Sequence, residues 1–335
     1  MSEDWPMTEE QARLATDAFD QAQDAMQELD RPASQYLQVP WPSLYRLTGP
    51  MAPGEIWMVG AFSGRGKTTF LTSLVEDLLV RGETVYYMGL ESRPHMIRTY
   101  FAAYRKGYAP GDVLSGTAKL HWPEWPTVRA ELKLEIDRMM RLGADSRLHV
   151  NGQPRIVAEE LGAAFEEAAA VGARVLVLDH IDQVQADRAN AYAVSRAVVE
   201  TLEDLAKHFG ITVLVSTQLN NEVLRGDPLA QLRPPQPHHV YMGGHKRFVV
   251  TGMLGLYRPV DPQASPEDVK AVKVGEKEPL EIATPNTMAV VCMKHRHFGS
   301  REGQKILLRV ERGRVIDAET ERDQYATDYE ALRRV

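Results

Sequence analysis

The sequence has a single cysteine, Cys292, among 335 residues. One thiol excludes an intrachain disulfide framework and any zinc site built from cysteines, and this fits a reducing cytoplasm. Long apolar runs are also absent: stretches such as Val175–Leu178 fall far short of the roughly 20 residues that a membrane-spanning helix needs. The N-terminus is acidic and unlike a signal peptide. Because 44% of the residues are hydrophobic and 25% are charged, we expect a globular, cytoplasmic protein with no membrane partner.

Basic residues are scarce at the N-terminus. Residues 1–30 hold nine acids and one base, Arg13, a net charge of −8, whereas the whole chain carries −7. The other 305 residues are therefore nearly neutral, at +1, which leaves room for the local positive charge that phosphate binding needs. Apolar residues recur at helical spacing from Leu14 to Leu29, which predicts one amphipathic helix. Its apolar stripe is expected to dock on its own core or on a neighbouring subunit. We name residues 1–38 the acidic arm.

From Glu55 onward, short β-type runs alternate with helical segments. This pattern is typical of an α/β fold with a twisted, mostly parallel sheet and helices on both faces. The preceding segment, Pro40–Gly54, is rich in proline and predicts a linker with turns. Residues 39–317 form the predicted main domain, and 318–335 a C-terminal tail. The sequence predicts helices over 67–81, 94–105, 127–142, 157–171 and 191–209, and strands over 56–59, 84–88, 148–150, 174–178, 211–216, 253–256, 287–293 and 305–310.

A candidate phosphate-binding loop follows the first predicted strand. Residues 61–68 fit the pattern G-x-x-x-x-G-K-[ST], except that Ala61 replaces the first glycine. A turn that leaves a strand and opens a helix points backbone N–H groups inward, and the helix N-terminus adds partial positive charge. Lys67 is expected to reach the β- and γ-phosphates of ATP, and Thr68 to ligate Mg²⁺. The alternative is a glycine-rich turn that only caps a helix. The candidate nucleotide-binding residues are Ala61, Phe62, Ser63, Gly64, Arg65, Gly66, Lys67, Thr68 and Thr69.

Acidic residues follow two of the predicted strands. Asp179 comes directly after the apolar run Val175–Leu178, as expected of a carboxylate that holds Mg²⁺ beside a phosphate loop. Glu91 follows the strand after the phosphate-loop helix. Because parallel strands share one crevice at their carboxyl ends, Glu91 is a candidate general base for water. Without the phosphate loop, Asp179 would be interpreted as a turn or cap residue and Glu91 as a solvated glutamate.

Polar side chains also end two later strands. Gln218 is a candidate sensor of the γ-phosphate. Lys294 and Arg296 alternate in an extended segment, so they project to the same side, as a pair of cations for a phosphate must. Residues 294–315 hold seven bases and two acids, a net charge of +5. The alternative for this segment is a strand edge kept soluble by its charge.

The stretch 220–247 is long for a loop, and loops of such length are usually functional or disordered. Its position after Gln218 makes it the candidate for contact with single-stranded DNA, with His239 or Tyr241 available for base stacking. A plain mobile surface loop is the alternative. The candidate DNA contacts are Arg225, Arg233, Lys246 and Arg247.

Taken in order, five segments resemble the five helicase motifs of the DnaB-like replicative helicases: AFSGRGKTTF, Leu90-Glu91, VLVLDHID, STQLNNE and KHRHFG. The resemblance runs roughly from Val39 to Asp317. It implies a RecA-like P-loop ATPase core and an ATP-driven, hexameric ring that moves along single-stranded DNA as a helicase.

The resemblance also implies roles for single residues. Arg296 resembles the arginine finger and Lys294 its partner, both reaching the ATP of a neighbouring subunit. Glu91 matches the catalytic glutamate, and Gln218 matches the glutamine of the third motif. The acidic arm resembles the linker helix with which subunits of that family dock. A loader or other replication proteins are the further partners that the resemblance suggests.

The sequence departs from the family pattern in two respects. We expect no room for the family's N-terminal helical domain, which contacts primase. After Asp179 come His180, Ile181 and Asp182, where the family more often has an aromatic residue, an aliphatic residue and glutamine; these positions bear on the coupling between nucleotide and DNA. Two other functions stay open: a RecA- or RadA-type recombination or repair ATPase that binds DNA without processive unwinding, and an ATP-switched, KaiC-like scaffold for protein partners.

Overall fold

The computed structural model describes residues 9–141, 146–151, 156–184, 191–240, 246, 248–273 and 280–317. The chain divides into two compact units between Tyr36 and Leu37. The first unit contains the helix α1 (Glu9–Leu29) and the short 3-10 turn η1 (Ala33–Gln35). Phe19, Met26 and Leu29 of α1 are exposed. The amphipathic helix predicted for the acidic arm is therefore present, with large apolar side chains open to solvent.

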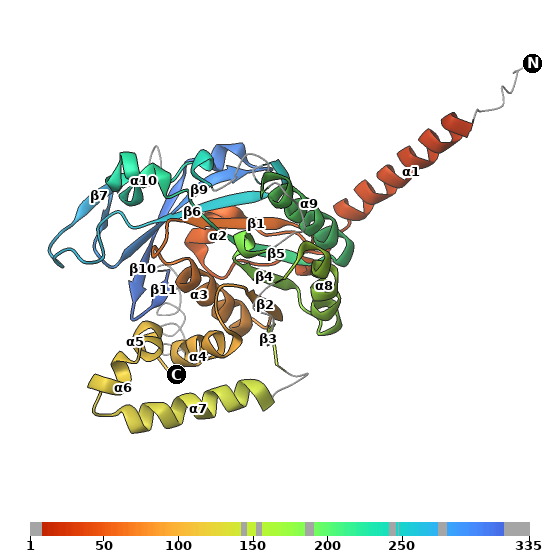
Figure 1. The fold of residues 1–335 in the computed structure, drawn as a ribbon. Helices are drawn as coiled ribbons and strands as arrows, with labels where there is room; N and C mark the ends of the chain where they lie inside the picture. Colours follow the sequence, from red (N-terminus) through yellow and green to blue (C-terminus); the bar gives the residue numbers. More distant parts are fainter. Residues whose placement is uncertain are drawn as a thin grey trace, which may run out of the picture. The chain divides into compact units, whose positions relative to one another are not determined.

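The second unit is organised around a sheet of nine strands (Figure 1), in the order β11-β10-β9-β6-β1-β5-β4-β2-β3. The six strands from β6 to β3 in that order are parallel, whereas β9, β10 and β11 run antiparallel to their neighbours. A separate hairpin pairs β7 with β8. The strands are β1 (Ile56–Ala61), β2 (Val85–Gly89), β3 (Leu148–Val150), β4 (Val175–Asp179), β5 (Thr212–Gln218), β6 (Gly252–Tyr257), β7 (Lys270–Lys273), β8 (Leu280–Ala283), β9 (Thr287–His295), β10 (Lys305–Glu311) and β11 (Arg314–Ile316).

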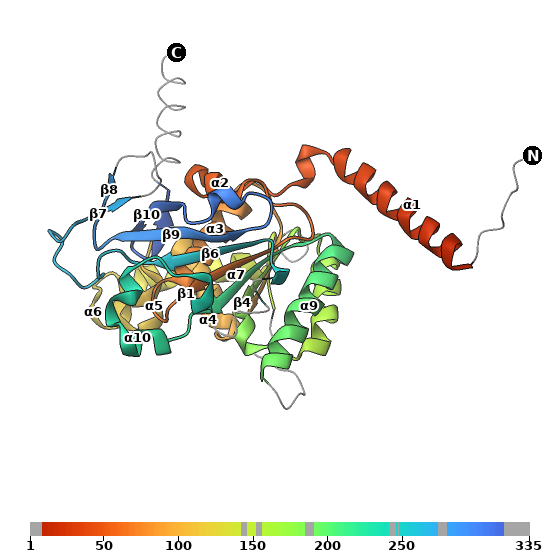
Figure 2. The same ribbon diagram turned by 90° about the horizontal axis from the view of Figure 1, so that it is seen from above.

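Helices cover both faces of the parallel part of the sheet (Figures 1 and 2). Trp57 and Val59 of β1 belong to one core cluster, together with residues of α2, α3, α4 and α7, while Ile56 and Met58 belong to the other, together with α8 and α9. Alternate residues thus point to opposite faces, and burial on both sides explains why these strands are continuous apolar runs. The helices are α2 (Pro42–Thr48), α3 (Lys67–Val80), α4 (Pro94–Arg105), α5 (Pro110–Ser115), α6 (Thr117–His121), α7 (Trp125–Arg141), α8 (Leu161–Ala170), α9 (Ala191–Phe209) and α10 (Glu222–Gly226), with 3-10 turns η3 (Ala158–Glu160), η4 (Ile181–Gln183), η5 (Pro228–Leu232), η6 (Pro237–His239) and η7 (Gly299–Arg301).

The predicted fold class, a mostly parallel α/β sheet preceded by a helical arm, is confirmed. The interpretation of Pro40–Gly54 as a linker is wrong. Pro42 occupies the first turn of α2, a position where its missing N–H costs nothing. Trp41 is 1% exposed, and its ring meets Phe70 edge-on at 5.3 Å. The segment is therefore part of the core.

The hairpin β7–β8 and the edge strand β11, both short, were not predicted from the sequence. In the part of the chain that the structure describes, no helix is long and apolar enough to cross a membrane.

Candidate active site

The loop between β1 and α3 has the geometry of a phosphate cradle. β1 ends at Ala61 and α3 begins at Lys67. Gly64 and Gly66 adopt left-handed backbone conformations, with φ of 71° and 95°, which residues with a Cβ rarely adopt. Gly66 also lies against Met288, whose Cε would be 2.6 Å from an added Cβ. The chain thus turns sharply from strand to helix, and the free N–H groups at the start of α3 face this turn.

Lys67 lies at the first position of α3, and its ammonium donates to the carbonyl of Ala61 at 3.4 Å. Burial lowers the pKa of Lys67, and the negative charges of Asp179, Glu91 and Asp182 partly oppose that shift. A partly desolvated ammonium gains strongly from an anion beside it. Lys67 is therefore well placed to take a phosphate oxygen.

Asp179 is the centre of a cluster of hydroxyl groups at the carboxyl end of β4. It is 6% exposed, and it accepts hydrogen bonds from Thr68 at 3.1 Å, from Tyr87 at 3.0 Å and from Ser216. These donors come from α3, β2 and β5, so three elements converge on one carboxylate. Hydroxyl and carboxylate oxygens are the ligands that Mg²⁺ prefers. Thr68 and Asp179 therefore fit the Mg²⁺ ion that the sequence predicts.

Glu91 follows β2, the strand that pairs with β4. Gly89, the last residue of β2, pairs with Asp179 in the parallel register, and the N–H of Leu90 donates to the Asp179 carbonyl at 2.7 Å. The Glu91 side chain is 64% exposed, and its Oε2 is 3.6 Å from Nε2 of His180. The carboxyl ends of β2 and β4 therefore share one crevice, and Glu91 has the access to solvent that a base for water needs.

Asp182 was not predicted as a site residue. It connects η4 to the end of β5 and to Lys246. It lies in η4, directly after β4, and it accepts hydrogen bonds from the Thr217 hydroxyl at 3.0 Å and from the Gln218 N–H at 2.8 Å. Burial tends to raise the pKa of Asp182, but hydrogen bonding from His180 and the charge of Lys246 hold that pKa well below its ordinary value. The one sequence feature that could have pointed to Asp182 was its departure from the family pattern at this position.

The position of Lys246 contradicts its predicted role as a DNA contact. Lys246 is 2% exposed, and its Nζ is 2.5 Å from Oδ1 of Asp182. If this ammonium moved to a DNA phosphate, the Asp182 carboxylate would stay buried without a counter-charge, which is strongly destabilising. Its partner, a carboxylate three residues after Asp179, could not be inferred from the sequence of the loop alone.

Arg225 and Gln218 line the same cleft, at the carboxyl ends of β4 and β5. The cleft has a volume of about 340 Å³ and is also lined by His180, Asp182 and Asn220. Gln218 pairs in register with Ala61, so the cleft borders the phosphate loop. One candidate DNA contact is thus adjacent to the candidate nucleotide sensor.

The other candidate DNA contacts differ in their surroundings. Arg233 is exposed and forms an ion pair with Asp227 at 2.8 Å. The ring of His239, a candidate for base stacking, lies 6.3 Å from that of Phe62 in the phosphate loop. Arg247 and Tyr241 lie outside the described residues.

Lys294 and Arg296 lie level with the amino ends of the parallel strands, whereas the phosphate loop lies at their carboxyl ends. Because β9 runs antiparallel to β6, its last residue, His295, pairs with Gly252 at the start of β6, and Gly252 pairs with Trp57 near the start of β1. The phosphate loop leaves the other end of β1, at Ala61. Four residues at roughly 3.3 Å each place the two levels about 13 Å apart.

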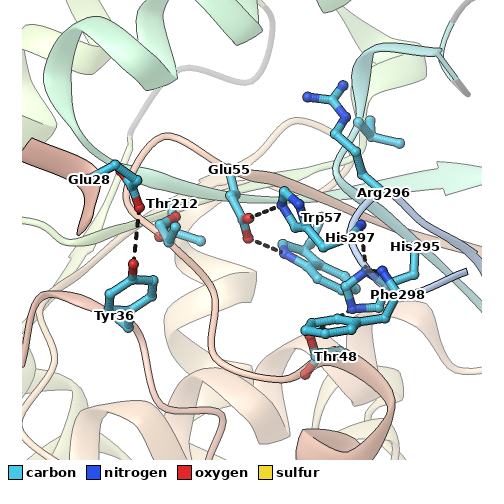
Figure 3. A network of polar contacts seen from close by, with 12 residues as sticks. Glu28, Tyr36, Thr48, Glu55, Trp57, Thr212, His295, Arg296, His297 and Phe298 are labelled. Carbon is cyan, nitrogen blue, oxygen red and sulfur yellow. Dashed lines mark hydrogen bonds and ion pairs between the residues drawn. The ribbon is translucent and has the colours of Figure 1, made fainter. Parts of the chain in front are cut away.

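The side chains of Lys294 and Arg296 contact the segment before β6. Arg296 donates from Nη2 to the carbonyls of Phe248 and Val249, and Lys294 donates from Nζ to the carbonyl of Val250. Figure 3 shows Arg296 pointing away from His295 and His297, which flank it in the chain. The side chains of both predicted cations thus contact carbonyls of residues 248–250, away from the phosphate loop of their own chain.

Residues 37–232 match the family model of the DnaB-like helicase C-terminal domain. Among solved structures, an ATPase domain is similar with a TM-score of 0.67 at 14% identity, over 89% of this chain and 98% of its own. A DnaB-like replicative helicase, studied with its interactions with primase, has a TM-score of 0.65 at 14% identity, over 93% of this chain and 67% of its own. The RadB recombinase has a TM-score of 0.47 at 17% identity, over 84% and 99%. No curated protein sequence matches.

Proposed function

Because this chain belongs to the family of DnaB-like helicase C-terminal domains, we propose that it is a Mg²⁺-dependent ATPase that assembles into a hexameric ring and moves along single-stranded DNA. Each hydrolysis site combines two subunits. One subunit supplies the phosphate loop with Asp179 and Glu91, and its neighbour supplies Arg296 with Lys294. The acidic arm, residues 1–38, docks on the next subunit.

The first half of the site binds the nucleotide and activates water. Lys67 and the N-terminus of α3 bind the β- and γ-phosphates. Thr68 and Asp179 would hold Mg²⁺, which would supply positive charge to neutralise the phosphate oxygens. Glu91 accepts the proton of the attacking water. Gln218 pairs with Ala61, the last residue of β1, and this adjacency to the loop supports a role in sensing the loss of the γ-phosphate.

The position of Arg296 carries the proposal of a shared site. Its backbone lies level with the start of β1, whereas the phosphate loop leaves the end of β1. Its side chain bonds to carbonyls of residues 248 and 249, which precede β6. An arginine in this place does not reach the phosphates bound by its own chain, so a role in hydrolysis requires a second copy. Arginine fingers supplied by a partner typically raise kcat by about 10³- to 10⁵-fold.

The cleft beside Gln218 supports a coupling between nucleotide and DNA. Arg225 is exposed at this cleft, and Asp182, which also lines it, bonds both to the Gln218 N–H and to Lys246 at the far end of the 220–246 segment. A movement of Gln218 on hydrolysis would therefore be transmitted through Asp182 to Lys246. It would affect both ends of the segment that we propose to contact single-stranded DNA.

Mixing two inactive variants tests the shared site. We expect Lys67→Ala and Arg296→Ala each to abolish ATPase activity, and an equal mixture to recover part of it, because a mixed ring contains interfaces with one intact phosphate loop and one intact finger. Arg309→Ala is the matched control: Arg309 is exposed in the same basic segment and pairs with Glu311, so this variant should keep full activity. No recovery in the mixture would exclude a finger supplied in trans.

DNA dependence is tested separately. We expect single-stranded oligonucleotides to stimulate the ATPase and the protein to displace a strand from a forked duplex. Stimulation without displacement would favour a recombination-type ATPase, and absence of stimulation would favour a protein scaffold.

A further inference from the structure

The turn that carries Arg296 is built around the buried imidazole of His295. His295 is 3% exposed, and its ring meets Trp57 edge-on at 5.2 Å and Phe298 at 5.0 Å. Its Nδ1 accepts the backbone N–H groups of His297 and Phe298, each at 3.3 Å. The chain therefore wraps around this ring directly after Arg296.

The other ring nitrogen ties the turn to the end of α2. Nε2 of His295 is 3.0 Å from the carbonyl of Thr48, at the end of α2. Because a carbonyl only accepts, Nε2 carries the proton, and Nδ1 is left free to accept the two backbone N–H groups. A second proton would sit on Nδ1 and face these two donors. The turn thus requires one neutral tautomer.

A second contact holds the same turn to the start of β1. Nε2 of His297 is 3.0 Å from one carboxylate oxygen of Glu55, and the indole N–H of Trp57 donates to the other at 3.0 Å. Figure 3 shows the histidines on one side of the chain, against Glu55 and Trp57, and Arg296 on the other. The turn thus places the anchoring histidines and the cation on different sides of the chain.

We propose that His295 is a positioning residue for Arg296, which it serves by fixing the turn after β9 and so the place from which the guanidinium would reach a neighbouring subunit. The inference rests on the proposed function, because it gives Arg296 the finger role. His295 itself touches no nucleotide. It acts by accepting hydrogen bonds from two backbone N–H groups and by donating one to the carbonyl of Thr48.

The surroundings of His295 favour the neutral ring. The charged and titratable groups that face it are Glu55 before β1, Arg301 at the end of η7, Glu302 directly after it, and His297 in the turn itself. Burial lowers the pKa of His295, Arg301 and His297 act in the same direction, and the Thr48 carbonyl and Glu55 oppose them. The imidazole is therefore neutral at pH 7, as the turn requires.

Two substitutions separate the roles of this ring. His295→Leu keeps most of the volume and removes both hydrogen-bonding atoms. His295→Asn keeps an acceptor at the position of Nδ1, in the arrangement by which asparagine stabilises turns. We expect His295→Leu to lower kcat by about 10- to 100-fold, the effect of a displacement near 1 Å in a catalytic group. We expect His295→Asn to stay within about threefold of the wild type, since the turn keeps its acceptor. KM for ATP should stay unchanged in both.

Combination with other variants shows whether His295 acts through Arg296. His295→Leu together with Arg296→Ala should be no less active than Arg296→Ala alone, because the finger is already lost. Mixing His295→Leu with Lys67→Ala should restore activity, as for Arg296→Ala, because the Lys67→Ala subunits bring an intact finger. Thermal unfolding of each variant, alone and in the presence of ADP, reports folding and nucleotide binding.

The outcomes are distinct. If Arg296→Ala is inactive and His295→Leu has wild-type kcat, the positioning role is wrong and the proposed function stands. If His295→Leu is inactive and Lys67→Ala does not rescue it, His295 acts on the fold and not through the finger. If Arg296→Ala itself is active, the shared site fails and the inference fails with it. Should His295→Leu not fold, His295→Asn decides: a folded Asn variant with a large loss of kcat contradicts the proposal.

Discussion

Replacing Lys246 with methionine should destabilise the protein far more than the loss of an ordinary lysine. The side chains of Lys246 and Asp182 are 3% and 11% exposed, and their charges are in direct contact. Methionine keeps the length of the side chain and removes the charge. Breaking a buried pair by removing one partner typically costs 3–5 kcal/mol, because the remaining charge is left without compensation. Asp182 keeps its bonds from Thr217 and Gln218, so we expect the lower end, about 3 kcal/mol.

Substitution of Asp182, the partner of Lys246, shows whether the loss of stability comes from the uncompensated charge. Asp182→Asn in the Lys246→Met background removes the uncompensated charge, so the double variant should recover to within about 1 kcal/mol of the wild type and should be about 2 kcal/mol more stable than Lys246→Met alone. The measurement is the free energy of unfolding from urea titrations at pH 7. The depressed pKa of Asp182 means that the carboxylate is charged at this pH; its contribution is present above its ordinary pKa and is lost as the pH falls through the depressed one.

Lys207→Met is the matched control. Lys207 makes the same kind of pair, with Glu203 at 2.8 Å, but its side chain is 61% exposed. An exposed pair of this kind contributes about 0.5 kcal/mol or less. A Lys246→Met variant that loses no more stability than Lys207→Met would refute the reasoning, and so would a double variant as unstable as Lys246→Met alone.

Three further predictions follow from single contacts. A Cβ at Gly89 would lie 2.1 Å from Cδ1 of Ile97, so Gly89→Ala should lower the free energy of unfolding in urea by about 2 kcal/mol, and Ile97→Val, which deletes that methyl group, should recover part of it; no recovery would contradict the contact. Burial raises the pKa of Cys292 to about 12, so at pH 8 the folded protein should resist iodoacetamide and react only as it unfolds; rapid labelling of the native state would be inconsistent with this. Arg225→Ala should weaken single-stranded DNA binding and reduce the salt slope by about one, as measured by fluorescence anisotropy; an unchanged slope would argue against a phosphate contact.

The parallel core and the nucleotide site were predictable because their signals are local. Val175–Leu178 is apolar at every position and ends in Asp179, which is what a strand buried on both faces and open at its carboxyl end requires. The phosphate loop combines glycines with left-handed backbone angles and a helix N-terminus within eight residues. Each of these constraints acts on neighbours in the sequence, so the sequence alone expresses it.

The remaining features depend on contacts between distant segments. Trp41 belongs to the core only because α2 packs near Phe70, and proline near it obscured the helix. Lys246 could be taken for a surface cation because its partner, Asp182, is 64 residues away in the sequence. The direction of β9 is set by its pairing with β6, and a strand's residue pattern is the same whether it runs parallel or antiparallel. The edge at which Arg296 lies was therefore beyond prediction from sequence.

The separation of Arg296 from the phosphate loop has a consequence for assembly. A contact that joins one edge of a subunit to the opposite edge of the next is heterologous, so a pair of subunits joined once leaves one phosphate loop and one arginine without partners. Only a closed head-to-tail cycle completes every site, and an array that fails to close grows as a filament. On the proposed function, dilution should therefore abolish hydrolysis while every subunit is still folded, and specific activity should rise with protein concentration until closed cycles predominate.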